Sequence, residues 1–286
     1  MTPWQGRRVE REPAEVDVEA GAKLFVFERF LRFHLAAHLT VSTVFGAREG
    51  TLGWGAASVR AVAVVALFVA VGLPRRWDRH VSVVLALGAG WAVAATFPTT
   101  SNHGFYAALL SLASVVLRDE PRRAVEYLRA TVLLVTFGAG AQKLLHGTWW
   151  RGSFVAWELA HGRFVGTIGR LLSAEELARL SSMREGREGF VLAGKALALV
   201  RAVMLGELLL PMLACVPRLR VWAAIGLLGL GLGFGLVADE VLFGGLFVAV
   251  VALFFSPSTA RALSLATAAL YVARACVFVA SGGRAW

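Results

Sequence analysis

The chain has 286 residues, of which 57% are hydrophobic, and its mean hydropathy is +0.66. Soluble domains are nearer half apolar, and apolar runs of about 20 residues recur here, so the composition indicates an integral membrane protein. The formal net charge of +10 comes from arginines that cluster between the apolar runs, as in the cytoplasmic loops of membrane proteins. The charge therefore predicts contact with a lipid bilayer and gives no argument for nucleic acid.

The apolar runs predict an all-α fold, a polytopic membrane bundle of about eight transmembrane helices. After a polar cytoplasmic tail at 1–21, spans are expected at 22–46, 53–73, 80–97, 103–117, 123–145, 189–216, 218–238 and 240–255. A last apolar stretch, 260–281, is either a ninth span or a surface helix. We therefore divide the chain into the tail, a transmembrane domain at 22–258, and a C-terminal helix and tail at 259–286.

Short interfacial helices are expected after the fifth span. Residues 149–159 are aromatic and amphipathic, which suits a helix lying at the membrane surface. Ser173 and Glu176 have the spacing of a capping box, which predicts the start of a short polar helix.

Loop charges predict the orientation. With the N-terminus in the cytoplasm, the basic loops after spans 2, 4 and 6 fall inside, and the short loops after spans 1, 3 and 7 fall outside with a single arginine among them. This arrangement predicts a multi-pass protein of the inner (plasma) membrane. It also places His103, Lys143, Asp239 and Glu240 together at the outer face.

Lys143 is the first candidate for chemistry. Only three of the 29 basic residues are lysines, and lysine, unlike arginine, can lose its proton when it is buried. Lys143 is therefore either a catalytic base or a lysine that extends to the lipid headgroups. His103, which follows Asn102, is either a proton shuttle at a pocket mouth or a polar cap on a membrane helix. Trp149 and Trp150 either shape that pocket or belong to the interfacial aromatic belt.

Several ionisable residues lie inside the predicted spans. Glu207 is in the middle of span 6, where it is either functional or neutralised by Arg201, by Lys195 or by a cation of span 1. Glu28 and Arg32, four residues apart, predict an ion pair. His34 and His38 share a helix face, but no third ligand at matching spacing follows, so no metal site is predicted.

Several motifs occur in the order found in one known family. The stretch Asn102-His103-GFYAALL resembles the NHxxYxxxLL element of the vitamin K-dependent gamma-carboxylases, and residues 139–144, AGAQKL, followed by WWRG at 149–152, resemble their AGxxKL…WxxG element. The stretch that begins at Ser173 resembles the short helix that follows in the same family. Glu207-LLLP is similar to a later block of the broader HTTM group of membrane proteins, and LFFSP at 253–257 closes the last core helix in a similar way. The resemblance covers residues 22–258.

The resemblance implies an enzyme. In the carboxylases the lysine matching Lys143 is the candidate base and the histidine matching His103 assists it. The cofactor is a reduced quinone of the vitamin K hydroquinone type, with O2 and CO2 as co-substrates and no metal. Asn102, Trp149, Trp150, Glu207, Asp239 and Glu240 would then line the substrate pocket.

Two departures from the family shape the expected activity. The chain stops at Trp286, which leaves no room for the large outer domain that binds peptide substrates, and residues 232–238 lack a histidine common in related chains. We therefore expect oxygenation or epoxidation of a lipidic quinol rather than peptide carboxylation. The alternative is a non-catalytic membrane scaffold, or a partner in peptide or toxin maturation that contacts a peptide or another membrane protein.

Overall fold

The computed structural model describes residues 13–48, 64–66, 69, 71–73, 77–96, 102–182, 192–236 and 241–280. These residues form helices and turns and contain no strand, which confirms the all-α prediction. The long helices are α1 (Pro13–Arg48), α3 (Asp78–Thr96), α4 (Asn102–Val116), α5 (Pro121–His146), α8 (Gly194–Ala214), α9 (Arg220–Leu236), α10 (Val241–Val251) and α11 (Pro257–Ala280). Shorter elements are α6 (Ser153–Ala160), η2 (Ile168–Leu171), α7 (Ala174–Ser182) and η4 (Ala252–Phe254).

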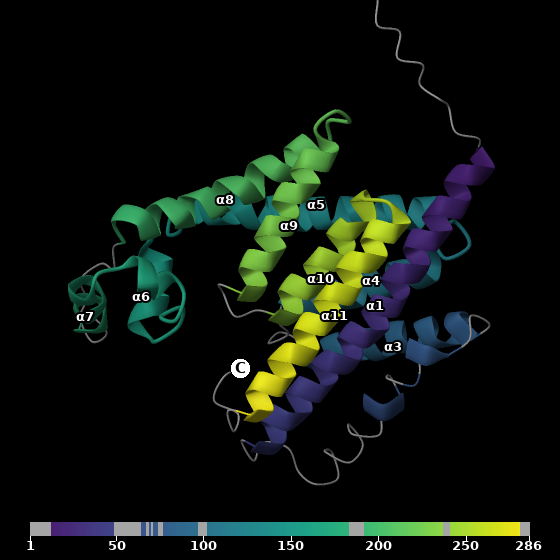
Figure 1. Cartoon of the computed structure of the whole chain (residues 1–286), viewed down its shortest axis with the longest axis horizontal. Helices are drawn as coiled ribbons and strands as arrows, with labels where there is room; N and C mark the ends of the chain where they lie inside the picture. Colours follow the sequence, from purple (N-terminus) through teal and green to yellow (C-terminus); the bar gives the residue numbers. More distant parts are fainter. Residues whose placement is uncertain are drawn as a thin grey trace, which may run out of the picture.

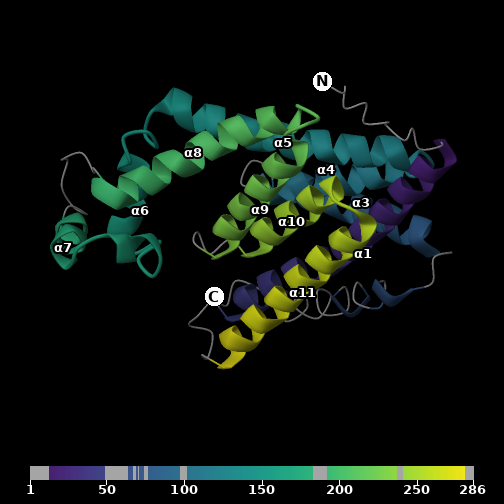
Figure 2. The same ribbon diagram turned by 45° about the horizontal axis from the view of Figure 1, so that its top comes forward.

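The helices form a bundle with one protruding end. In Figures 1 and 2, α1 and α11 run side by side, α10 and α9 follow next to them, and α5 and α8 lie along each other and extend toward α6 and α7. Helices α3 and α4 pack as a further pair, and α4 also contacts α1 and α5. The main core lies where α1, α4, α5, α9 and α10 meet, around Phe27, Leu110, Leu128, Leu227 and Leu246.

Helices α9 and α10 approach each other closely because glycines line their contact. A Cβ atom on Gly244 would lie 2.5 Å from the carbonyl oxygen of Gly231 and 2.6 Å from the amide nitrogen of Gly235. Small residues permit such backbone contact, which is a common way for helices to associate in membranes. The glycine-rich sequence of α9 is therefore explained by packing.

The described residues contain three helices that are long and apolar enough to cross a membrane: Pro121–His146, Gly194–Ala214 and Pro257–Val277. Three shorter apolar helices, Gly104–Val116, Arg220–Gly233 and Phe243–Phe254, accompany them. Large apolar side chains also point outward, among them Trp91 at 75% exposure and Leu134 at 71%. A surface of this kind favours lipid over water, so the coarse prediction of a membrane protein is supported.

Most helices lie where the apolar runs placed them. Helix α1, however, begins at Pro13 rather than near residue 22, because proline suits the first turn of a helix and Glu15 complements its positive end. Residues 53–63, which begin the predicted second span, lie outside the described residues. Helix α11 packs along α1, where Nδ1 of His34 lies 2.9 Å from the hydroxyl oxygen of Tyr271.

Candidate functional site

Lys143 of α5 and Glu207 of α8 form an ion pair between two apolar helices. The Lys143 Nζ atom lies 2.5 Å from Oε1 of Glu207, and the two side chains are 18% and 2% exposed. A buried charge that loses its partner costs about 3–5 kcal/mol, so each residue keeps the other in place. Both residues were predicted separately, with Glu207 either functional or neutralised by Arg201, Lys195 or a span 1 cation. In the structure the cation that pairs with Glu207 is Lys143.

Gly140 allows α5 and α8 to come close enough for this pair. It lies almost one helical turn before Lys143, on the side of α5 that faces α8. A Cβ atom at this position would lie 3.0 Å from Cβ of Glu207 and 3.1 Å from its carbonyl carbon. The absence of a side chain at Gly140 therefore lets α8 approach α5 closely enough for the carboxylate of Glu207 to reach the lysine amine.

The turn after α5 places two tryptophans beside the pair. Gly147 ends α5 in the left-handed conformation, with φ of 67°, and its N–H donates to the carbonyl oxygens of Lys143 and Leu144. The chain then turns so that the ring centroid of Trp149 lies 4.2 Å from Lys143 Nζ. A cation at this distance from an indole face is attracted to it. Trp149 is thus a direct neighbour of the candidate base.

Arg201, which was not among the predicted site residues, anchors Trp150. Its Nε donates to the carbonyl oxygen of Trp150 at 2.9 Å, and its guanidinium carbon lies 4.7 Å from the Trp150 ring centroid. Arg201 and Glu207 both belong to α8. Side chains of this one helix therefore contact Lys143 and Trp150. No sequence signal pairs Arg201 with Trp150, because the two are 51 residues apart.

The structure therefore brings together four predicted site residues: Lys143, Trp149, Trp150 and Glu207. Asn102 and His103 lie in the first turn of α4, but their side chains are outside the described part of the structure, as are Asp239 and Glu240 entirely. One turn later, Tyr106 is buried and its ring lies 6.3 Å from that of Phe243 in α10. The start of α4 thus packs toward α10, and the participation of His103 stays a prediction.

One carboxylate oxygen of the Lys143–Glu207 pair has no hydrogen-bond partner. Oε2 of Glu207 is buried and has no hydrogen-bond partner. A buried carboxylate oxygen without a partner is costly, so such groups call for an explanation in a native structure. This oxygen is therefore an unused hydrogen-bond acceptor beside the amine of Lys143.

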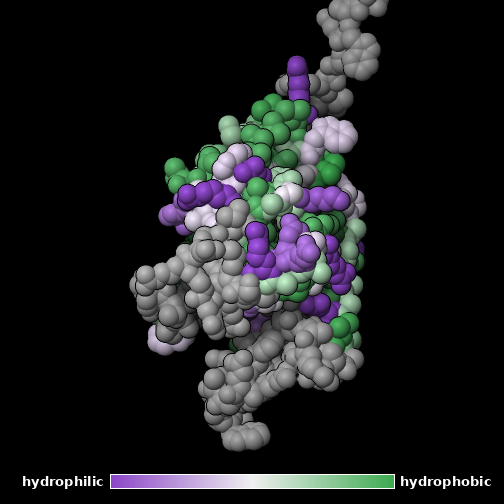
Figure 3. Space-filling view, turned by 90° about the vertical axis from the view of Figure 1, so that its left-hand side faces the viewer, coloured by the Kyte–Doolittle hydropathy of each residue, from purple (hydrophilic) through white to green (hydrophobic). Residues whose placement is uncertain are grey.

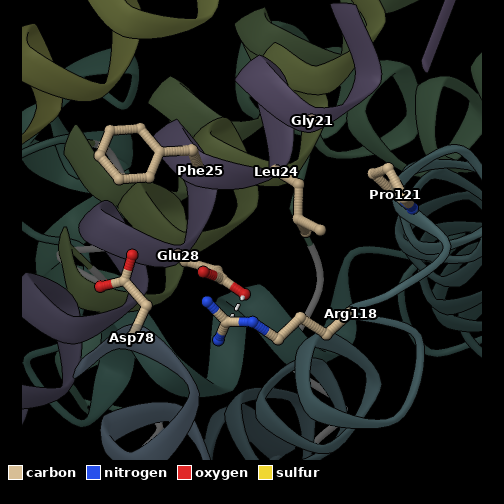
Figure 4. A pocket seen from close by; sticks show the side chains of 7 residues that line it. All are labelled: Gly21, Leu24, Phe25, Glu28, Asp78, Arg118 and Pro121. Carbon is tan, nitrogen blue, oxygen red and sulfur yellow. Dashed lines mark ion pairs between the residues drawn. The ribbon is translucent and has the colours of Figure 1, made fainter. Parts of the chain in front are cut away.

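A second polar cluster lies at the other end of α5, where α1, α3 and α4 meet. Figure 4 shows Glu28, Asp78 and Arg118 around a cavity of about 150 Å³. Nη1 of Arg32 donates to Asp78 at 2.6 Å, whereas its predicted partner Glu28 is 4.0 Å away. Glu28 lies 3.9 Å from Arg118. The predicted pair is therefore present, but Asp78 is the closer partner, because the start of α3 packs beside α1.

The segment after the site forms a small domain-like unit. Helix α6 and the region around α7 pack on the start of α8 through a separate apolar cluster that includes Val155, Leu159, Leu180 and Leu192. The predicted capping box is confirmed, since Ser173 N–H donates to Glu176 at 2.8 Å and Glu176 N–H donates to Ser173 Oγ at 3.1 Å. Viewed from the end that carries α6 and α7, hydrophilic residues gather across the middle of the surface (Figure 3).

Comparisons with known proteins identify no relative: no family model matches the sequence, and neither a curated protein nor a solved structure is significantly similar to it.

Proposed function

We propose that this chain is an HTTM-like membrane enzyme that acts on a lipid-soluble quinol by oxygenation of the epoxidation type, with Lys143 as the base. The observation that carries the proposal is the ion pair of Lys143 with Glu207 beneath the ring of Trp149. Ionisable groups inside membrane helices usually serve function. The motifs around Lys143 and His103 add the resemblance to the vitamin K-dependent carboxylases.

Each neighbour of Lys143 has a role in this proposal. Oε2 of Glu207 accepts a hydrogen bond from one quinol hydroxyl. Trp149, which contacts Lys143 and stacks with Phe154, holds the amine in position. Lys143 accepts a proton only after its own proton has passed to Glu207, and the 2.5 Å contact provides that route. The amine then deprotonates the quinol. In the overall reaction the quinol is oxidised to its epoxide and O2 is reduced, with one oxygen atom in the epoxide and the other in water.

The proposed setting is the inner membrane, with about eight or nine spans, the N-terminus in the cytoplasm and the site toward the outer face. The positions of two polar clusters at opposite ends of α5 agree with this orientation. Asp78 at the start of α3 and Arg118 just after α4 meet beside α1, whereas Lys143 lies at the opposite end of α5. His103 would assist Lys143 from α4. Vitamin K hydroquinone-like quinols, O2 and CO2 enter the proposal by resemblance alone, and peptide carboxylation is not part of it.

Replacement of the lysine by arginine tests the proposal. The Lys143→Arg variant keeps the positive charge beside Glu207 but cannot supply a neutral base. In lipid nanodiscs supplied with a reduced naphthoquinone and O2, the wild-type chain should form the epoxide and the variant should lose about 100-fold or more of that rate. Lys195→Arg, at an exposed lysine of α8, is the matched control and should keep full activity. Equal turnover by wild type and Lys143→Arg would exclude the base role.

A second candidate function is a non-catalytic scaffold or peptide-maturation partner. The observation that favours it is the same ion pair, because Lys143 and Glu207 also clamp α5 to α8 and hold the turn that leads to α6. A scaffold needs the clamp but no proton transfer. It would therefore show no quinol turnover, and Lys143→Arg would leave its assembly with a peptide or membrane partner intact.

A further inference from the structure

A long groove of about 840 Å³ lies between α1 and α11. Its walls come from one face of each helix, with Phe25, Val26, Phe30 and Phe33 on α1 and Leu265 and Ala268 on α11. When the polar lining residues are included, the lining positions of each helix recur at spacings of three, four and seven residues, so the groove follows both helix axes. It is lined by α1, α11 and the segment at 71–72, so it is distinct from the pair formed by Lys143 and Glu207.

One end of this groove is cationic. Arg261 lines it from the first turns of α11 and is exposed, and the positive N-terminal end of α11 at Pro257 and Ser258 opens into it. Arg29 lines it from α1, and its guanidinium carbon lies 5.1 Å from the ring centroid of Phe25, one turn nearer the start of α1. On the wall that α1 contributes, Arg29 lies between Phe25 and Phe30, and Phe30 and Phe33 continue away from it toward the middle of the helix.

Arg29 keeps positive charge available although Asp78 is near. Asp78 lies 2.6 Å from Arg32 and 3.5 Å from Arg29, so its closer ion pair is with Arg32. The terminal nitrogens of Arg29 donate to the carbonyl oxygens of Val71 and Leu73, but its Nε has no hydrogen-bond partner. The groove thus has surplus positive charge and an unused N–H donor along the wall that α1 contributes.

The dimensions match one leaflet of a bilayer. The lining residues run over eleven residue steps on each helix, from Ala22 to Phe33 and from Pro257 to Ala268, which corresponds to about 17 Å at 1.5 Å per residue. Half of a hydrocarbon core is about 15 Å thick. Helix α11 is itself long and apolar enough to cross a membrane, so the groove runs along a helix that would contact lipid.

We propose that this groove binds one anionic phospholipid, with its phosphate beside Arg261 and Arg29 and an acyl chain along Phe30, Phe33, Leu265 and Ala268. Charge complementarity selects an anionic lipid over a zwitterionic one. The apolar side chains that line the groove can contact an acyl chain, which a soluble phosphate does not have. This proposal is independent of the reaction at Lys143, since it concerns a different face of the bundle.

Native mass spectrometry of the full chain in detergent tests this lipid site. Dioleoyl phosphatidylglycerol should bind with a dissociation constant several-fold lower than that of dioleoyl phosphatidylcholine. Arg261→Gln should weaken phosphatidylglycerol binding about fivefold, the effect of one arginine near a phosphate. The same change should leave phosphatidylcholine binding unaltered. Arg218→Gln, at an exposed arginine outside the groove, is the control and should change neither.

Two further measurements separate the acyl chain from the headgroup. Ala268→Phe should fill the apolar part of the groove and weaken both lipids, whereas glycerol phosphate at millimolar concentration should not displace phosphatidylglycerol. The proposal fails if the two lipids bind equally, if Arg261→Gln and Arg218→Gln behave alike, or if glycerol phosphate competes. Displacement of the lipid by a neutral naphthoquinol would also overturn it, because the groove would then be a quinol site. If Ala268→Phe does not fold, the comparison of the two arginine variants still decides the result.

Discussion

The carboxylate of Glu207 lies 2.5 Å from the amine of Lys143, although 64 residues and several turns of chain separate the two. Both residues are in helices apolar enough to cross a membrane. Each helix therefore carries a charge that it would not tolerate alone, and the two helices become dependent on each other. This relationship joins the stability of the bundle to the residue for which we propose chemistry.

The first prediction concerns the stability of this pair. Lys143→Met leaves Glu207 buried without a cation and should lower the free energy of unfolding in detergent by about 3 kcal/mol. The double variant Lys143→Met with Glu207→Leu should recover most of that loss, because two apolar side chains pack against each other and leave no buried charge. Lys195→Met is the control, since Lys195 is exposed on the same helix as Glu207. Additive losses in the double variant would show that the two charges do not interact.

Gly140 supports a second prediction. Gly138→Ala should be neutral or stabilise by about 1 kcal/mol, because alanine favours helix and nothing lies within 4 Å of the new methyl group. Gly140→Ala gains the same helix propensity, but its methyl group must push against the backbone of Glu207. We expect Gly140→Ala to be less stable than Gly138→Ala by about 1–2 kcal/mol. Thermal unfolding of both variants in one detergent measures the difference, and equal midpoints would contradict the close approach.

Sequence patterns predicted what depends on local order along the chain. The apolar runs located α3, α4, α5 and α9 to within a few residues, because each begins or ends at a proline or an arginine cluster. The capping box at Ser173 and Glu176 was also found from sequence, since both partners lie in one turn. Lys143 and Glu207 were each recognised as unusual, because an ionisable residue within an apolar run is a local feature.

Pairings between distant segments were not predictable in the same way. The partner of Glu207 is set by the packing of α5 on α8, and the partner of Trp150 is set by the same contact. Asp78 was not predicted to be a buried partner, because it follows a basic loop and belongs to no apolar pattern that would indicate burial. Only the packing of α3 beside α1 shows that it neutralises Arg32.

Asp78 supports a third prediction. Asp78→Asn removes the carboxylate that lies 2.6 Å from Arg32, and both side chains are 1% exposed. The variant should lose about 3 kcal/mol in free energy of unfolding, because the guanidinium of Arg32 is left with Glu28 at 4.0 Å as its remaining acidic partner. Asp119→Asn is the matched control at an exposed aspartate after α4 and should stay within about 0.5 kcal/mol of wild type. Chemical unfolding in detergent compares them, and similar midpoints would argue against the buried pair.

The fourth prediction concerns the pH dependence of α7. The backbone N–H of Ser173, and then its side chain, donate to Glu176 and lower the pKa of this carboxyl group below its usual 4.5. Because the pKa is lower in the folded helix than in the unfolded chain, the ionised carboxylate stabilises α7 above the usual pKa. That stabilisation is lost as the pH falls through the lowered value.

Hydrogen exchange at the amides of α7 measures this dependence, once the intrinsic pH dependence of exchange is removed. Protection in the wild-type chain should be highest near neutral pH and should decline as the pH falls below the usual 4.5 and through the lowered pKa of the carboxyl group. Glu176→Gln cannot ionise, so its protection should be lower at neutral pH and nearly flat with pH. Glu175→Gln removes a neighbouring exposed carboxylate outside the capping box and should retain the wild-type decline. If Glu175→Gln flattened the profile as well, general charge at the helix start, rather than the reciprocal contact of Ser173 and Glu176, would explain the effect.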